Sequence, residues 1–166
     1  MSASEELVEA YRGVMQRHAH GVTAIAVRRG ATDLAMTATS VASASLRPPM
    51  MLFCVHSDAR FREALDTVDT WAVSLLDGNS EKEAELLAMP GRPTIGQLTG
   101  VSYSRGELSE AALLDNAQGW LECRTEWIKT AGEHDVVVGR VLSARLGVTA
   151  TGGLVHRLGR YQVMGR

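Results

Sequence analysis

The hydrophobic pattern of this chain is mostly that of β-strands, with short apolar or alternating runs bounded by glycine, proline and polar residues. Most of these runs follow one another through turns, without the intervening helices of a parallel sheet. We therefore expect a mainly β fold with flanking helices, in which antiparallel strands close into a small barrel. The runs that predict strands cover residues 22–28, 34–41, 50–55, 71–76, 121–128, 135–146, 154–156 and 161–164.

Helical spacing appears in three places. Ser2 and Glu5 have the spacing of a capping box, and the apolar residues behind them share one helix face, so we expect this first helix to cover one end of the sheet. Asp58 is expected to cap the second helix, and Asn79 or Ser80 the third. The three predicted helices cover residues 3–19, 58–65 and 81–88.

Residues 89–119 form the least periodic stretch, interrupted by Pro90, Pro93 and several glycines. We expect this stretch to be largely loop or short helix. Long connections of this kind are often functional.

Composition narrows the class of protein. With 166 residues, 45% apolar residues, 22% charged residues and a net charge of −2, the chain is expected to be one soluble domain spanning 1–166. A net charge of −2 does not indicate a surface that binds nucleic acid or an anionic membrane. No apolar stretch is long enough to span a bilayer and no export signal is visible, so we expect a cytoplasmic protein. Cys54 and Cys123 lack metal-ligand spacing and are expected to stay reduced.

The run from Met36 to Ser57 carries the most chemical information. A hydroxyl-rich segment leads through the turn at Pro48 and Pro49 into an apolar strand that ends in polar residues. Small hydroxyl donors and acceptors beside a strand end suit a flat polar ligand. Serine and threonine also simply favour strands and turns, and the residues alone leave both interpretations open.

An ordered set of short motifs resembles the flavin reductase-like family over nearly the whole chain. That resemblance implies an antiparallel Greek-key split β-barrel of the FMN-binding type, which forms a homodimer with flavin bound near the subunit interface. The matching pieces are Gly21-Val22-Thr23, Met36-Thr37 with Ser40, Ser45-Leu46-Arg47-Pro48-Pro49, Cys54-Val55, Leu114-Asp115, Trp120-Leu121-Glu122-Cys123, Gly132-Glu133-His134 and Gly159-Arg160-Tyr161.

Carried over to these positions, the resemblance implies a set of flavin contacts. The flavin phosphate is expected beside Ser57 at the start of the second helix, with Arg60 adding a charge; Arg60 on a solvated helix face is the alternative. Arg160 is expected either to pair with a dinucleotide phosphate or to be an ordinary interface cation. The implied cofactor-binding residues are Met36, Thr37, Ala38, Thr39, Ser40, Cys54, Val55, His56, Ser57, Arg60, Phe61 and Arg160.

Two further residues match positions that the family places near the nicotinamide. His134 is expected to orient the nicotinamide and Tyr161 to form a wall of the pocket. Glu133 stands where the family usually has aspartate, which leaves the role of Glu133 open. A turn histidine that is merely exposed is the alternative for His134.

The resulting hypothesis is an NAD(P)H:flavin oxidoreductase that transfers a hydride from NADH or NADPH to FMN or FAD and supplies reduced flavin to a partner monooxygenase. A non-catalytic flavin-binding or electron-carrier module is the alternative, and a split-barrel reductase using another reducing cofactor, such as a deazaflavin, is a third. The sequence lacks the glycine motif of a Rossmann site, the nucleophile elbow of a hydrolase and a metal-ligand set.

Overall fold

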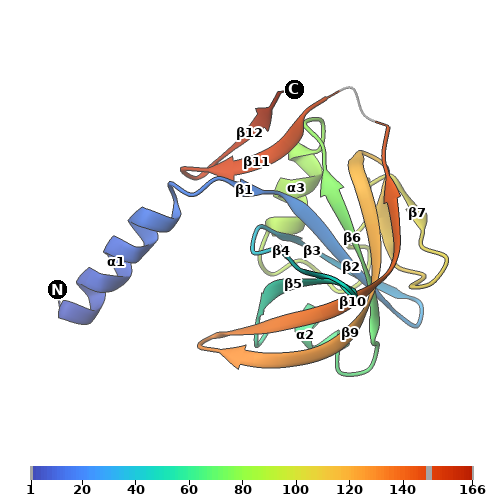
Figure 1. Cartoon of the computed structure of the whole chain (residues 1–166), viewed down its shortest axis with the longest axis horizontal. Coiled ribbons are helices and arrows are strands. Elements are labelled where there is room, and N and C mark those ends of the chain that lie inside the picture. Colours follow the sequence, from blue (N-terminus) through green and yellow to red (C-terminus); the bar gives the residue numbers. More distant parts are fainter. Residues whose placement is uncertain (1, 149–150, 166) are drawn as a thin grey trace.

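The computed structural model describes residues 2–148 and 151–165, and most of its strands lie in one curved antiparallel sheet (Figure 1). The strands of this main sheet are β2 (Thr23–Arg29), β3 (Thr32–Ala38), β4 (Ala42–Leu46), β5 (Pro49–His56), β6 (Thr70–Leu76), β9 (Ala117–Ala131) and β10 (His134–Leu146). Their order across the sheet is β3-β2-β6-β9-β10-β5-β4, and every neighbouring pair is antiparallel. The mainly β, antiparallel architecture predicted from the sequence is therefore confirmed.

The last two predicted strands, 154–156 and 161–164, were expected to close the same sheet as the others, but they do not join the main sheet. They form a separate three-stranded sheet with the short strand β1, in which His20 pairs with His156. The strand that precedes them, β10, already has β9 on one side and β5 on the other, so β11 cannot pair with β10. The bounds are β1 (His20–Gly21), β11 (Gly153–Arg157) and β12 (Arg160–Met164), and a further hairpin is made by β7 (Tyr103–Arg105) and β8 (Ala112–Leu114).

Both faces of the central strands are buried, which explains their nearly continuous apolar sequences. Along β2, Ile25 packs in the cluster inside the barrel, whereas Ala24 and Ala26 pack in a second cluster on the outer face. Inside the barrel, the rings of Phe53 and Trp71 meet edge to face with centroids 4.9 Å apart. The helix α3 (Glu81–Ala88) covers the outer cluster.

The first helix, α1 (Ala3–Met15), has the predicted capping box between Ser2 and Glu5. It does not cover the sheet: none of its residues is buried, and it projects away from the barrel (Figure 1). Its apolar face finds no partner surface within the described chain. In this part of the chain no helix has both the length and the apolar character that crossing a bilayer requires.

The other two helices lie against the barrel. The helix α2 (Arg60–Ala64) has Ala59 at its N-cap instead of the predicted Asp58, and the Asp58 backbone N–H donates to Nδ1 of His56 in the preceding turn. The bounds of α3 are those predicted. Ser80 is its N-cap residue, but the Ser80 hydroxyl bonds to Asp77 and to the Asn116 carbonyl instead of to the helix.

Candidate functional site

A groove of about 530 Å³ runs between β3, α2 and the segment that follows α3. We call it the β3–α2 groove; it is lined by residues 34–37, 56, 58–61, 87–92 and 97. Its volume falls in the range of small-molecule sites. Five predicted cofactor-binding residues come together here, and they are Met36, Thr37, His56, Arg60 and Phe61.

One wall of the groove is the free edge of β3. The backbone N–H of Ala35 donates to Oε1 of Gln97, and the Ala35 carbonyl accepts from Nη2 of Arg92, so both groups point away from β2. In an antiparallel ladder, every second residue points the same way, which places the backbone N–H and C=O of Thr37 on this outer side too. The edge therefore presents a paired donor and acceptor, as the edge of a flavin ring requires.

Two of the hydroxyl groups that the sequence suggested as ligand contacts, those of Thr37 and Ser40, are used inside the protein. The Thr37 hydroxyl donates to the Ala84 carbonyl of α3 at 2.6 Å. The Ser40 hydroxyl accepts from the Cys54 N–H at 3.1 Å and donates to the Cys54 carbonyl at 3.2 Å. These two hydroxyls are therefore engaged within the protein, and the outward-facing polar groups of Thr37 are those of its backbone.

The predicted cofactor-binding residues of β3 and β5 also differ in whether their side chains are buried in the core or accessible from outside the barrel. Ala38 and Val55 point into the barrel core, with 5% and 3% of their surface exposed, so their side chains cannot reach a ligand outside the barrel. Thr39 and Cys54 are half-buried. This follows from the alternation of a strand, which turns Cys54 and His56 outward and Val55 inward.

Ser57 does not face the β3–α2 groove. Its hydroxyl donates to Oδ1 of Asp135 at 3.2 Å, in a neighbouring hollow that also contains Glu63 and Asp66. The guanidinium of Arg62, with Nε 2.5 Å from Oδ2, holds the pKa of Asp135 below its ordinary value, and hydroxyl donors act in the same direction. This acidic hollow is unsuited to a phosphate. The helix α2 adds no anion site, since it has only five residues.

His134 lies directly across from His56 in the pairing of β10 with β5. The two imidazole rings meet edge to face with centroids 5.3 Å apart, so His134 stands next to the groove that His56 lines. The adjacent Glu133 contributes its backbone carbonyl, which accepts from the Ser57 N–H, while its side chain is exposed.

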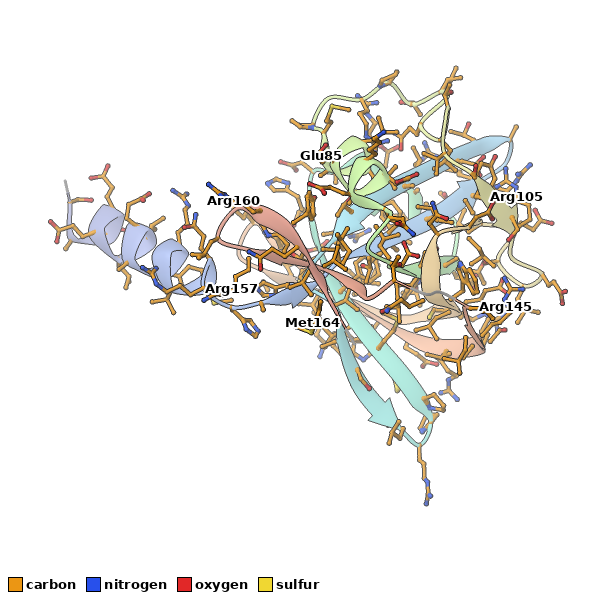
Figure 2. The ribbon with its side chains drawn as sticks, turned by 90° about the horizontal axis from the view of Figure 1, so that it is seen from above. Glu85, Arg105, Arg145, Arg157, Arg160 and Met164 are labelled. Carbon is orange, nitrogen blue, oxygen red and sulfur yellow. The ribbon has the colours of Figure 1, made fainter. Side chains whose placement is uncertain are left out.

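The other predicted residues of the nicotinamide side lie elsewhere in the chain. Tyr161 and Arg160 belong to β12, and neither lines the groove. Burial raises the pKa of Tyr161, and the carboxylates of Glu85 and Glu81 add to this effect, which places the phenol beside α3. Figure 2 shows Arg160 at the turn of the β11–β12 hairpin, on the side of the molecule from which α1 projects. Within one chain, Tyr161 therefore lies outside the groove that His134 adjoins.

Sequence reasoning missed Arg92 and Gln97, which hold the segment after α3 against the edge of β3. Both lie in the irregular stretch that was expected to be functional. The sequence identified the stretch but carried no signal for the individual residues.

The chain is similar to known proteins over most of its length. Residues 15–165 match the flavin reductase like domain. An NADH-dependent FAD reductase of Streptomyces globisporus is 36% identical over 143 residues, covering 82% of this chain and 78% of that protein. The reductase component of 4-hydroxyphenylacetate 3-monooxygenase from Thermus thermophilus is 33% identical over 139 residues, covering 84% and 85%.

Two solved structures have the same fold. BorF, the flavin reductase component of a bacterial two-component tryptophan halogenase, superimposes with a TM-score of 0.88 at 32% identity, over 96% of this chain and 99% of that chain. The NADH:FAD oxidoreductase SgcE6 of Streptomyces globisporus, in complex with NAD and FAD fragments, gives 0.87 at 32% identity, over 98% and 94%. The predicted split-barrel fold is confirmed.

Proposed function

Because this chain belongs to the flavin reductase-like family, we propose that it is an NADH-dependent flavin reductase that reduces FMN or FAD and supplies the reduced flavin to a separate monooxygenase. The observation that carries the proposal is the free edge of β3 in the β3–α2 groove, where the backbone donor and acceptor of Thr37 face outward beside Arg60. A flavin offers matching groups on its pyrimidine edge and on its phosphate.

The residues present fit a flavin. Thr37 would hold the polar ring edge through its backbone, and the partly buried side chain of Met36 lines the same groove. Phe61 supports the groove from the core, since only 5% of its surface is exposed. When bound, the flavin supplies the hydride-accepting chemistry, and reduced nicotinamide supplies the hydride. The task of the protein is to hold two rings at reacting distance and to exclude water. His134 would orient the nicotinamide from the end of β10, next to His56.

This assignment requires no strong acid or base from the protein. It accounts for a groove whose polar lining combines backbone amides, arginine, histidine and neutral side chains with a single carboxylate, that of Asp58. Tyr161 and Arg160 would reach this groove only from a second subunit, because β12 lies away from it in the same chain.

We further propose that the protein forms a homodimer. Along α1, Leu7, Tyr11 and Val14 lie on one face, with 70%, 65% and 67% of their surface exposed. An isolated helix of this length is only marginally stable in water, so this face needs a partner surface. A second copy of the chain is the partner that the family resemblance implies. The cytoplasmic location stays a prediction.

The test is anaerobic oxidation of NADH and of NADPH by the purified protein with FMN, FAD or no added flavin, following nicotinamide and flavin absorbance together. We expect NADH oxidation whose rate rises with added flavin until it saturates. Tight flavin binding without NADH oxidation would overturn the proposal in favour of a flavin-binding module. If neither NADH nor NADPH is oxidised and no flavin binds, the β3–α2 groove is not a flavin site.

A further inference from the structure

We propose that His56 is a positioning residue for the reaction with NADH, because its imidazole holds the ring of His134 in the orientation that the nicotinamide requires. The inference rests on the proposed function and deepens it. It names the side chain on which the orienting role of His134 depends, and it gives His56 a task beyond lining the β3–α2 groove.

The side chain of His134 is held by little else. Within residues 2–148 and 151–165 it makes no hydrogen bond and no ion pair, and the ring that it meets is that of His56, with centroids 5.3 Å apart and planes 70° apart. The outer torsion of a histidine side chain is soft, so packing decides where the ring points. Both nitrogens of His134 are therefore available to the carboxamide of a nicotinamide, while the direction of the ring depends on His56.

The ring of His56, in contrast, is fixed by its own turn. Its Nδ1 accepts a hydrogen bond from the Asp58 backbone N–H at 3.2 Å. Because this nitrogen accepts, the ring is held as the neutral tautomer with its proton on Nε2. The His56 carbonyl accepts from the Ala59 N–H at 2.9 Å, so the same turn fixes backbone and side chain. A fixed ring in contact with His134 limits the orientations open to the second ring.

The backbone keeps the two rings opposite each other. His56 is the last residue of β5 and His134 the first of β10, and they are direct partners in the antiparallel register. Just beyond this pair, the Ser57 N–H donates to the Glu133 carbonyl at 3.0 Å. Directly opposed side chains lie on the same face of a sheet, where aromatic pairs stabilise each other. The contact between the rings is therefore set by the strand pairing.

Two substitutions separate the ring of His56 from its acceptor nitrogen. His56→Asn removes the ring and keeps an acceptor oxygen near the Asp58 N–H, whereas His56→Phe keeps a ring and removes the acceptor. The values measured are kcat and KM for NADH at saturating flavin, and the affinities for FMN and FAD by fluorescence titration. His18→Asn is the matched control, because His18 also has an edge-to-face histidine contact, with His20 at 4.4 Å, and does not line the groove.

We expect His56→Asn to lower kcat/KM for NADH by about two- to tenfold, the factor that corresponds to one aromatic pair contact, while flavin affinity stays within about twofold of the wild type. His56→Phe should lose less than His56→Asn, since a ring remains against His134. His18→Asn should match the wild type in every value.

A double-mutant cycle with His134→Ala tests whether His56 acts through His134. If it does, adding His56→Asn to His134→Ala should change kcat/KM for NADH by less than about twofold, because the ring that His56 orients is already absent. Additive losses would overturn the inference, since His56 would then act on the cofactors independently of His134.

Wild-type kcat/KM in His56→Asn would overturn the inference as well. So would equal losses in His56→Asn and His56→Phe, because the ring contact would then not be what matters. Equal losses of NADH turnover and flavin affinity in His56→Asn would show a direct flavin contact in place of a positioning role. Failure of the proposed function is distinguishable, because wild-type protein would then not oxidise NADH with any flavin.

Discussion

The Ser40 hydroxyl hydrogen-bonds to both backbone polar groups of Cys54, accepting from its N–H and donating to its carbonyl. Ser40 follows β3, and Cys54 lies in β5, two strands near opposite ends of the sheet order. The Ser40 side chain thus links the end of β3 to β5, two strands that have no backbone pairing with each other, at the point where the curved sheet nearly closes. This closure fixes β5, which carries His56, beside the edge of β3 that forms the groove wall.

Ser40→Ala should therefore reduce both stability and flavin binding. Two hydrogen bonds are lost, and we expect the free energy of unfolding to fall by about 1–2 kcal/mol. Urea denaturation followed by tryptophan fluorescence measures this change. Ser104→Ala, an exposed serine of β7, is the control and should stay within about 0.5 kcal/mol of the wild type. Equal stabilities of the two variants would contradict the closure role of Ser40.

The elements that could be predicted from the sequence are those whose buried positions recur with the period of a strand or a helix. The strands β2, β5, β6 and β10 have alternating or continuous apolar runs because one or both of their faces are buried, and α3 has exactly the predicted bounds. The strand β4 was not separated from β3, because its residues are largely exposed and leave no hydrophobic pattern. It is held by pairing with β5 alone.

The site was predictable only in part, for a physical reason. Motifs located the β3 edge and His56, since those residues lie within one short stretch of sequence. The contact between Arg92 and Ala35 joins residues 57 positions apart, and nothing in the local pattern at either end reveals it. The hydrogen bond from the Thr37 hydroxyl to the Ala84 carbonyl is likewise a tertiary contact, which the residue types alone do not reveal.

The two cysteines should differ strongly in reactivity. Burial raises the pKa of Cys123 to about 12, and the carboxylate of Glu122 adds to the effect, so its thiolate is absent at neutral pH. Cys54 is half-buried on the outer side of β5. We expect dithiobis(nitrobenzoate) at pH 8 to label one thiol per native chain and both after denaturation. Cys54→Ser should abolish native labelling, and rapid labelling of Cys123 in that variant would contradict its burial.

The pair of Asp135 with Arg62 should contribute to stability in a pH-dependent way. The pKa of Asp135 is lowered in the folded state, so its contribution is present above the ordinary value of 3.8 and is lost as the pH falls through the lower folded pKa. Asp135→Asn should therefore be less stable than the wild type at pH 7. The difference between the two should shrink as the pH falls below about 4, the ordinary aspartate value.

Unfolding free energies of the wild type and of Asp135→Asn, measured from pH 7 to pH 2, show whether the stability difference shrinks toward low pH as expected. Because the two side chains form one pair, Arg62→Gln and the double variant should show strong non-additivity with Asp135→Asn at pH 7. Additive effects, or a difference between wild type and Asp135→Asn that grows toward low pH, would contradict the coupling.

His134→Ala tests the orientation of the nicotinamide. His134 lies beside the groove and makes no contribution to the β3 edge, so we expect kcat/KM for NADH to fall by about tenfold or more with flavin affinity within about twofold of the wild type. Steady-state NADH oxidation at saturating flavin and a flavin titration supply the two values. His18→Ala, an exposed histidine that follows α1, should leave both unchanged. Equal losses of NADH turnover and flavin affinity would contradict an orienting role.

The exposed face of α1 provides the test of self-association. Leu7→Glu combined with Val14→Glu places two charges on this face without touching the barrel, so a dimer that uses α1 should dissociate. Size-exclusion chromatography with light scattering should give a dimer mass for the wild type and a monomer mass for the double variant.

Glu6→Gln, an exposed position in the first turn of α1, is the matched control and should stay dimeric. A dimeric double variant would show that the subunits associate through another surface, and a monomeric wild type would contradict the homodimer. If dissociation also removes NADH oxidation while riboflavin still binds, the ring site is complete in one chain and the nicotinamide side is not. That result would place the partner subunit's contribution where Tyr161 and Arg160 are missing from the groove of a single chain.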